Sequence, residues 1–224
     1  MRALALLLVV AAAALAAAAP AGATSECRGL QVCVPVAGPW VLAPSRAETQ
    51  YELKCPRGYV VGGLDAELTN RALDVVFRAT LGSPVNPGIS TTNAAVFLAR
   101  LAAGRDATAS FRPHIGCIPS SGSGSRVPTA YAPGRPTVRR VTEVRLRRAT
   151  SHVVRACAAG ERLVAASHAI GFYTAAPPAL ALATDVQVTR TVRAGRVALT
   201  IRAGPLARAA LSVVQLDLVC AGGA

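Results

Sequence analysis

The sequence has little of what marks an enzyme or a nucleic-acid-binding protein. Aromatic residues make up only 4% of the 224 residues, and they do not interleave with the basic run as a base-stacking platform would. We therefore do not expect a nucleic-acid partner. The chain also lacks a Gly-x-Ser-x-Gly nucleophile turn, a phosphate-cradling glycine loop and a paired-histidine metal motif. Its three histidines, His114, His152 and His168, are scattered along the chain. These absences argue against an enzyme and predict neither a catalytic site, nor a cofactor, nor a metal.

The first residues predict export. Arg2 gives a positive start, an apolar run covers residues 4 to 19, and Ala21-Gly22-Ala23 provides a small-residue cleavage site. A membrane anchor is the alternative, but the alanine-rich run is a poor match to a hydrocarbon layer of about 30 Å. We therefore expect a signal peptide over residues 1–23 and a mature protein that is secreted or held in the cell envelope.

Six cysteines in an exported chain predict three disulfides. The segments 51–63 and 153–165 form a repeat: each has a strand-like lead-in, a cysteine, a glycine three residues later and then apolar residues. A closing cysteine follows the cysteine of each copy at nearly equal spacing, 62 and 63 positions. We therefore expect the pairs Cys55–Cys117 and Cys157–Cys220 and, by elimination, Cys27–Cys33. Zinc is the competing use of these cysteines, but no Cys-x-x-Cys occurs.

Hydrophobic periodicity predicts an all-β fold. Valines alternate with polar residues over 185–193, the same pattern covers 197–202, and Ala194-Gly195 between them suits a tight hairpin. Residues 93–104 read as a helix by composition, but their place in the repeat favours a strand. Gly62-Gly63 suits a β-bulge or sharp bend.

These patterns predict two tandem antiparallel β-sandwich or small-barrel modules, each closed by a disulfide. We expect module 1 over residues 24–117 with an N-terminal extension, a Ser/Gly/Pro linker over 118–137, and a basic module 2 over 138–224.

The opening Cys55-Pro56-Arg57-Gly58, with Gly62-Gly63 shortly after it and a distant closing cysteine, resembles small exported disulfide-clasped β-modules of GC-rich bacteria. The second copy departs from the pattern, because Ala158 stands where the proline would be and Ala165 replaces a glycine. The resemblance implies secretion and a β-fold. Because such modules have no assigned activity, the resemblance assigns no functional residue to this chain.

Charge is the one feature that indicates a partner. Residues 24–118 carry +2, whereas residues 119–224 carry +10. The second half therefore predicts an Arg-rich face that contacts an anionic wall polymer or lipid headgroups. Alternation along the expected strands assigns seven residues to this face: Arg139, Arg140, Arg145, Arg147, Arg148, Arg193 and Arg202. The competing explanation is GC-rich codon usage, since Lys54 is the only lysine among 24 basic residues.

The sequence thus favours a non-catalytic binding or envelope-associated structural protein. One alternative is a secreted hydrolase with an unrecognised site at Asp65, Glu67 or His168. Another is a protein-binding, inhibitor-like module that uses its loops.

Overall fold

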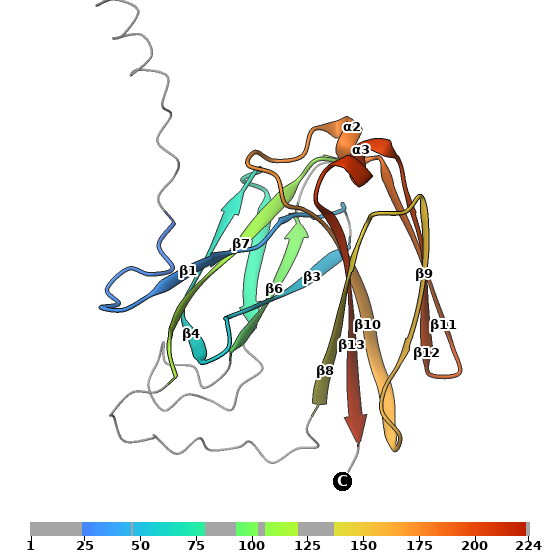
Figure 1. The fold of residues 1–224 in the computed structure, drawn as a ribbon, viewed down its shortest axis with the longest axis horizontal. Helices are drawn as coiled ribbons and strands as arrows, with labels where there is room; N and C mark the ends of the chain where they lie inside the picture. Colours follow the sequence, from blue (N-terminus) through green and yellow to red (C-terminus); the bar gives the residue numbers. More distant parts are fainter. Residues whose placement is uncertain (1–23, 46, 79–92, 103–105, 121–136, 223–224) are drawn as a thin grey trace, which may run out of the picture.

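A computed structural model describes residues 24–45, 47–78, 93–102, 106–120 and 137–222, and most of these residues lie in β-strands (Figure 1). The N-terminal half, residues 24–120, contains β1 Val34–Ala37, β2 Trp40–Leu42, β3 Glu48–Lys54, β4 Tyr59–Leu68, β5 Leu73–Arg78, β6 Ala94–Leu101 and β7 Ser110–Pro119. The C-terminal half, residues 137–222, contains β8 Thr137–Arg145, β9 Thr150–Ala156, β10 Glu161–Phe172, α2 Leu180–Ala183, β11 Val186–Arg193, β12 Arg196–Ala203, α3 Pro205–Ala209 and β13 Ser212–Gly222. The prediction of an all-β fold is confirmed.

The strands form three antiparallel sheets. The largest has the order β1-β7-β2-β10-β13-β8, with β4 also paired to β7, so it runs through both halves. The other two sheets have three strands each, β3-β6-β5 and β11-β12-β9. Two hydrophobic clusters account for the packing. One draws on strands of the N-terminal half, and the second is formed by β10 and β13 together with β11 and β12.

The strand orders of the two halves correspond. In the N-terminal half β7 lies between β4 and β1, and in the C-terminal half β13 lies between β10 and β8. The three-stranded sheets correspond in the same way, since β6 is central in one and β12 in the other. The correspondence extends to the register, because β4 and β10 each carry an irregularity, at Gly62 and at Val164.

Three disulfides join the pairs that the cysteine spacing predicts. Cys55–Cys117 and Cys157–Cys220 close long loops, and Cys27–Cys33 closes a short one. Cys117 lies opposite Val61 just before the irregularity in β4, and Cys220 lies opposite Leu163 just before the one in β10. Cys55 follows the end of β3 and Cys157 follows the end of β9, so the two long bridges occupy equivalent positions, joining β3 to β7 and β9 to β13.

Two local predictions also agree with the structure. Residues 94–101 form the strand β6 rather than a helix, and nearly all of that strand is buried between β3 and β5. Ala194 and Gly195 have positive φ values of 47° and 72° and connect β11 to β12. Positive φ at both central residues is the geometry of a type I′ hairpin turn.

The halves are joined by backbone and side-chain hydrogen bonds. Trp40 in β2 pairs with Phe172 in β10. The edge strand β3 contacts the C-terminal half through Glu52, whose N–H donates to Gln215 Oε1 (2.7 Å) and whose carbonyl accepts from Gln215 Nε2 (3.0 Å). Tyr51 donates to Glu143 Oε2 at 3.0 Å beside this contact. The side chain of Gln215 thus satisfies backbone groups that an edge strand leaves open.

Two predictions lie mainly outside the described residues: the signal peptide over 1–23, and residues 121–136 of the linker. Among the described helices, none has the length and apolar character needed to cross a membrane.

Candidate anion-binding surface

Two of the seven predicted anion-binding arginines are engaged by carboxylates. Arg139 bonds through its Nη1 to the buried Asp217 and to Gln50. Burial raises the pKa of Asp217, and the charge of Arg139 opposes that rise. Arg140 makes a two-point contact with Glu161 (2.9 and 2.6 Å), which lowers the pKa of that carboxyl. Arg139 and Arg140 therefore compensate charges of the protein itself.

Arginines outnumber acidic residues in the C-terminal half. Asp217 and Glu161 pair with Arg139 and Arg140, whereas Asp185 and Glu143 accept hydrogen bonds from the neutral Ala207 N–H and Tyr51 hydroxyl and keep their negative charge. No ion pair forms at the remaining arginines within the described part of the chain. We call these the uncompensated arginines: Arg145, Arg147, Arg148, Arg155, Arg162, Arg190, Arg193, Arg196, Arg202 and Arg208.

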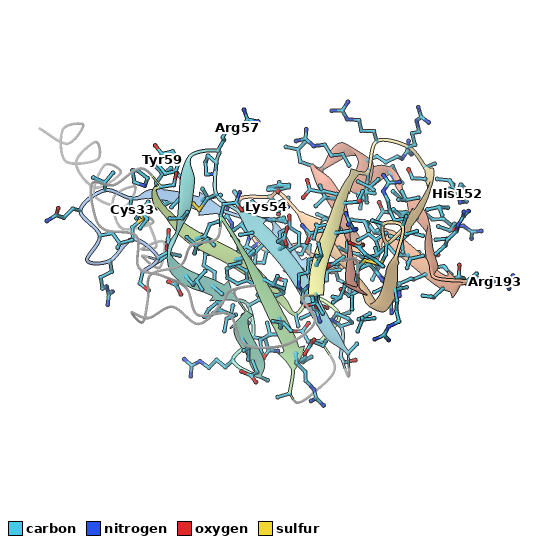
Figure 2. The ribbon with its side chains drawn as sticks, turned by 90° about the horizontal axis from the view of Figure 1, so that it is seen from below. Cys33, Lys54, Arg57, Tyr59, His152 and Arg193 are labelled. Carbon is cyan, nitrogen blue, oxygen red and sulfur yellow. A yellow bond between two sulfur atoms is a disulfide. The ribbon has the colours of Figure 1, made fainter. Side chains whose placement is uncertain are left out.

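Three uncompensated arginines lie on the exposed side of the sheet β11-β12-β9. On β12, Val197, Leu199 and Ile201 are buried, so Arg196 and Arg202 point outward. Register places Arg193 opposite Arg196 across the hairpin turn. Figure 2 shows Arg193 and His152 at the edge of the molecule that lies away from the N-terminal half.

The rest of this side contains several threonines, together with Ala198 and the exposed Val154. Thr200 lies between Thr189 on β11 and His152 on β9, and its Oγ1 is 3.2 Å from His152 Nδ1. Arg202 lies in the next row, between Gln187 and Thr150. We call this side, with Arg193, Arg196 and Arg202, the outer arginine face.

A second group of arginines lines a cavity of about 330 Å³ where β8 ends and β13 begins. Arg145 comes from the end of β8, Arg147 from the loop that follows, and Arg208 from α3. Arg208 is a site residue that the alternation pattern did not predict, because it lies on a short helix. We call this cavity the arginine pocket.

The arginine pocket also has apolar walls and a phenol. Leu146 and Leu211 line it, and Leu211 is 67% exposed. Ser212 lines it as well; this residue is buried, and its hydroxyl lacks a hydrogen-bond partner among the described groups. Burial raises the pKa of the Tyr173 phenol, which lies near both Arg145 and Glu143. Tyr173 therefore remains protonated and neutral at physiological pH.

The residues of the hydrolase alternative do not come together. Asp65 and Glu67 lie on β4, which pairs with β7, whereas His168 lies on β10 opposite Leu216. Burial opposes the charge of Asp65, but hydrogen bonds from Ser25 and Ala66 lower its pKa overall. Burial lowers the pKa of His168, and the charge of Arg190 acts in the same direction.

Glu67 has a different histidine as its partner. His114 Nε2 is 2.7 Å from Glu67 Oε1, and its Nδ1 is 3.9 Å from Glu26 Oε1. The backbone of Glu26 lies so close to Gly63 and Gly116 that a Cβ on either glycine would collide with the Glu26 carbonyl. His114 and these two glycines therefore hold the segment that contains Glu26 against β4 and β7.

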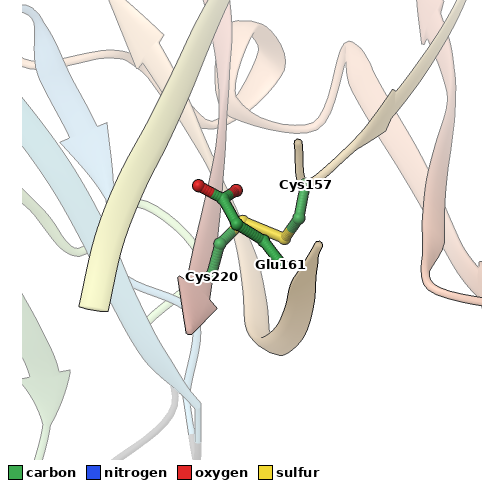
Figure 3. A group of neighbouring side chains, drawn as sticks. All are labelled: Cys157, Glu161 and Cys220. Atoms are coloured by element: carbon green, nitrogen blue, oxygen red, sulfur yellow. A yellow bond between two sulfur atoms is a disulfide. The ribbon is translucent and has the colours of Figure 1, made fainter. Parts of the chain in front are cut away.

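Cys157, Glu161 and Cys220 lie close together (Figure 3). The two sulfurs are joined in a disulfide, and Glu161 is bonded to Arg140 and to the Ala158 N–H. A disulfide offers no thiolate, the form in which cysteine ligates zinc. This group therefore fastens the turn after β9 to β13.

The outer arginine face and the arginine pocket together contain six arginines, of which the sequence predicted four and missed two, Arg196 and Arg208. Arg145, Arg147, Arg193 and Arg202 lie in them as predicted residues, and Arg148 lies in the loop beside them. Arg196 is an outward residue that the prediction omitted.

Comparison of the chain with protein-family models, with curated proteins and with solved structures finds no match.

Proposed function

We propose that the protein is an exported binding protein without catalytic activity, built from two tandem β-sandwich modules. The matching strand orders and the equivalent long disulfides support this architecture. In each half, one hydrophobic cluster takes side chains from two sheets, which is the packing of a β-sandwich. Three disulfides and no free cysteine among the described residues are typical of proteins outside the cytoplasm.

The C-terminal half, in this proposal, binds an anionic polymer of the cell envelope. The observation that carries the proposal is the set of uncompensated arginines, because ten arginines without an ion pair outnumber the two carboxylates, Asp185 and Glu143, that also lack one among the described residues. Positive charge that nothing in the fold neutralises attracts a polyanion and raises its local concentration. The lone Glu143 near the arginine pocket weakens this field only locally.

The outer arginine face suits a polymer better than a small ion. It is the open side of a three-stranded sheet, and Arg193 and Arg196 stand directly opposite each other across the turn. Like charges at such positions repel when their side chains are about 5 Å apart. A chain of phosphates or carboxylates lying across the face relieves that repulsion. The threonines of the face add hydroxyl donors and acceptors for hydrogen bonds to the polymer.

The test measures retention of the purified mature protein on isolated cell envelope as a function of salt. Arg193→Gln, Arg196→Gln and Arg202→Gln together remove three charges from the face. The matched control removes three exposed charges from the N-terminal half by Arg28→Gln, Arg57→Gln and Arg71→Gln. We expect retention to fall as salt rises. The first variant should weaken retention and make the slope of log affinity against log salt concentration shallower by roughly three. The control variant should keep both the retention and the slope of the parent protein.

Equal loss in both variants would mean that net charge alone is responsible and would contradict the proposal. Retention that salt does not change would contradict it as well. Retention on vesicles of anionic lipid, but not on envelope freed of lipid, would replace the polymer by a membrane surface.

A further inference from the structure

The arginine pocket differs from the outer arginine face in shape and in lining. It is a concave cavity of about 330 Å³, within the range of small-molecule sites. Three positive charges line it from three separate segments: β8, the following loop and α3.

The charges indicate the head of a ligand. A carboxylate has two oxygens and is satisfied by one guanidinium in a two-point contact, whereas a phosphate monoester offers three oxygens and up to two negative charges. Arg145, Arg147 and Arg208 have no carboxylate partner in the described chain, and the neutral Tyr173 phenol, whose hydroxyl lies 3.5 Å from that of Tyr51, adds no negative charge beside them. Three guanidiniums around one cavity therefore match a phosphate better than a carboxylate.

The walls indicate that the ligand also has an apolar part. Leu146 is buried and Leu211 is 67% exposed, and both line the cavity. Leu206 on α3 is another exposed leucine close in sequence to Arg208. A free phosphate ion would leave these surfaces in water, whereas an alkyl or aryl chain would cover them.

We propose that the arginine pocket binds an amphiphilic phosphate, with the phosphate held by Arg145, Arg147 and Arg208 and the apolar chain lying against Leu146 and Leu211. This site is independent of polymer binding by the outer arginine face. Two sources share this chemistry: a soluble alkyl phosphate, and the headgroup of an anionic phospholipid with part of its chain.

Titration calorimetry with hexyl phosphate tests the pocket directly, with inorganic phosphate and hexanol as partial ligands. We expect hexyl phosphate to bind at least about tenfold more tightly than inorganic phosphate, and hexanol not to bind measurably. Arg208→Gln should lower the affinity for hexyl phosphate by about tenfold. Arg162→Gln, which removes an exposed charge outside the pocket, should leave its affinity unchanged.

A second variant tests the apolar wall. Leu211→Asn changes an exposed side chain, so the fold is retained. The variant should bind hexyl phosphate more weakly than the parent protein does, and its affinity for inorganic phosphate should be unchanged. Vesicles of phosphatidylcholine with and without phosphatidic acid then separate the two sources. Retention of the protein that requires both phosphatidic acid and Arg208 indicates the lipid headgroup. Retention on neither kind of vesicle indicates the soluble phosphate.

The proposal is overturned if hexyl phosphate does not bind, if it binds no better than inorganic phosphate, or if Arg208→Gln and Arg162→Gln weaken it equally. Each of these results leaves retention on envelope and its dependence on Arg193, Arg196 and Arg202 to be judged separately.

Discussion

Replacing Arg139 by methionine should destabilise the protein strongly, although Arg139 was predicted to be a ligand-binding residue. Its partner Asp217 is 2% exposed and lies in β13, and its other partner, Gln50, lies in β3 of the N-terminal half. Removing one member of a buried ion pair leaves the other charge without a partner, at a cost of about 3–5 kcal/mol. Arg145→Met is the matched control, because Arg145 is exposed and has no carboxylate partner; its cost should stay within about 0.5 kcal/mol.

Urea unfolding at neutral pH measures this difference. Trp40 is the only tryptophan, is buried, and pairs with Phe172 where the halves meet, so its fluorescence reports on that junction. A double variant, Arg139→Met with Asp217→Leu, should recover most of the lost stability, since it removes the buried charge as well. The reasoning is refuted if Arg139→Met costs no more than Arg145→Met, or if the double variant is less stable than the single one.

The same variant should show a characteristic pH dependence. Burial raises the pKa of Asp217 in the folded protein, so the folded state holds this proton more tightly than the unfolded chain does. The free energy of unfolding therefore rises as the pH falls from the raised pKa toward the ordinary value of 3.8. Without Arg139 the pKa of Asp217 rises further, so this gain should begin at a higher pH in Arg139→Met than in the parent protein.

Two further predictions concern stability. Replacing Cys157 and Cys220 by alanine opens a loop of 63 positions and should lower the free energy of unfolding by about 4 kcal/mol. The same change at Cys27 and Cys33, separated by 6 positions, should lower it by about 2 kcal/mol. Equal urea midpoints for the two variants would contradict this expectation. Ala194→Gly should raise the unfolding free energy by about 1 kcal/mol, because Ala194 adopts φ of 47° in the turn between β11 and β12; thermal unfolding checks this, and a lower melting temperature would show that the turn geometry is wrong.

The strand pattern and the disulfides could be predicted because their signals are local or repeated. Alternation over 186–203 reports one buried side of a sheet, and the near-equal cysteine spacing reports the same clasp twice. Composition alone misled at 94–101, where good helix formers make a strand. β6 lies between β3 and β5, and the burial of its side chains there outweighs their intrinsic preference.

The site could be predicted only in part, since partners in β-folds are distant in sequence. Alternation found the outward arginines Arg193 and Arg202, but it contains nothing about Asp217, which lies 78 positions from Arg139. Arg208 escaped prediction because α3 is a short helix with no periodic pattern, and only the fold brings it to the cavity that Arg145 lines. The approach of Glu26 to Gly63 and Gly116 was equally invisible, because it joins a loop to two strands.

The central claim is that an anionic polymer covers the outer arginine face, and arginine-selective modification read by mass spectrometry tests it most directly. The mature protein is treated with phenylglyoxal, free and bound to immobilised poly(glycerol phosphate). The account predicts that bound polymer protects Arg193, Arg196 and Arg202, while Arg28, Arg57 and Arg71 of the N-terminal half stay reactive. Equal reactivity of the two sets in the bound state, or protection of the N-terminal set alone, would contradict it.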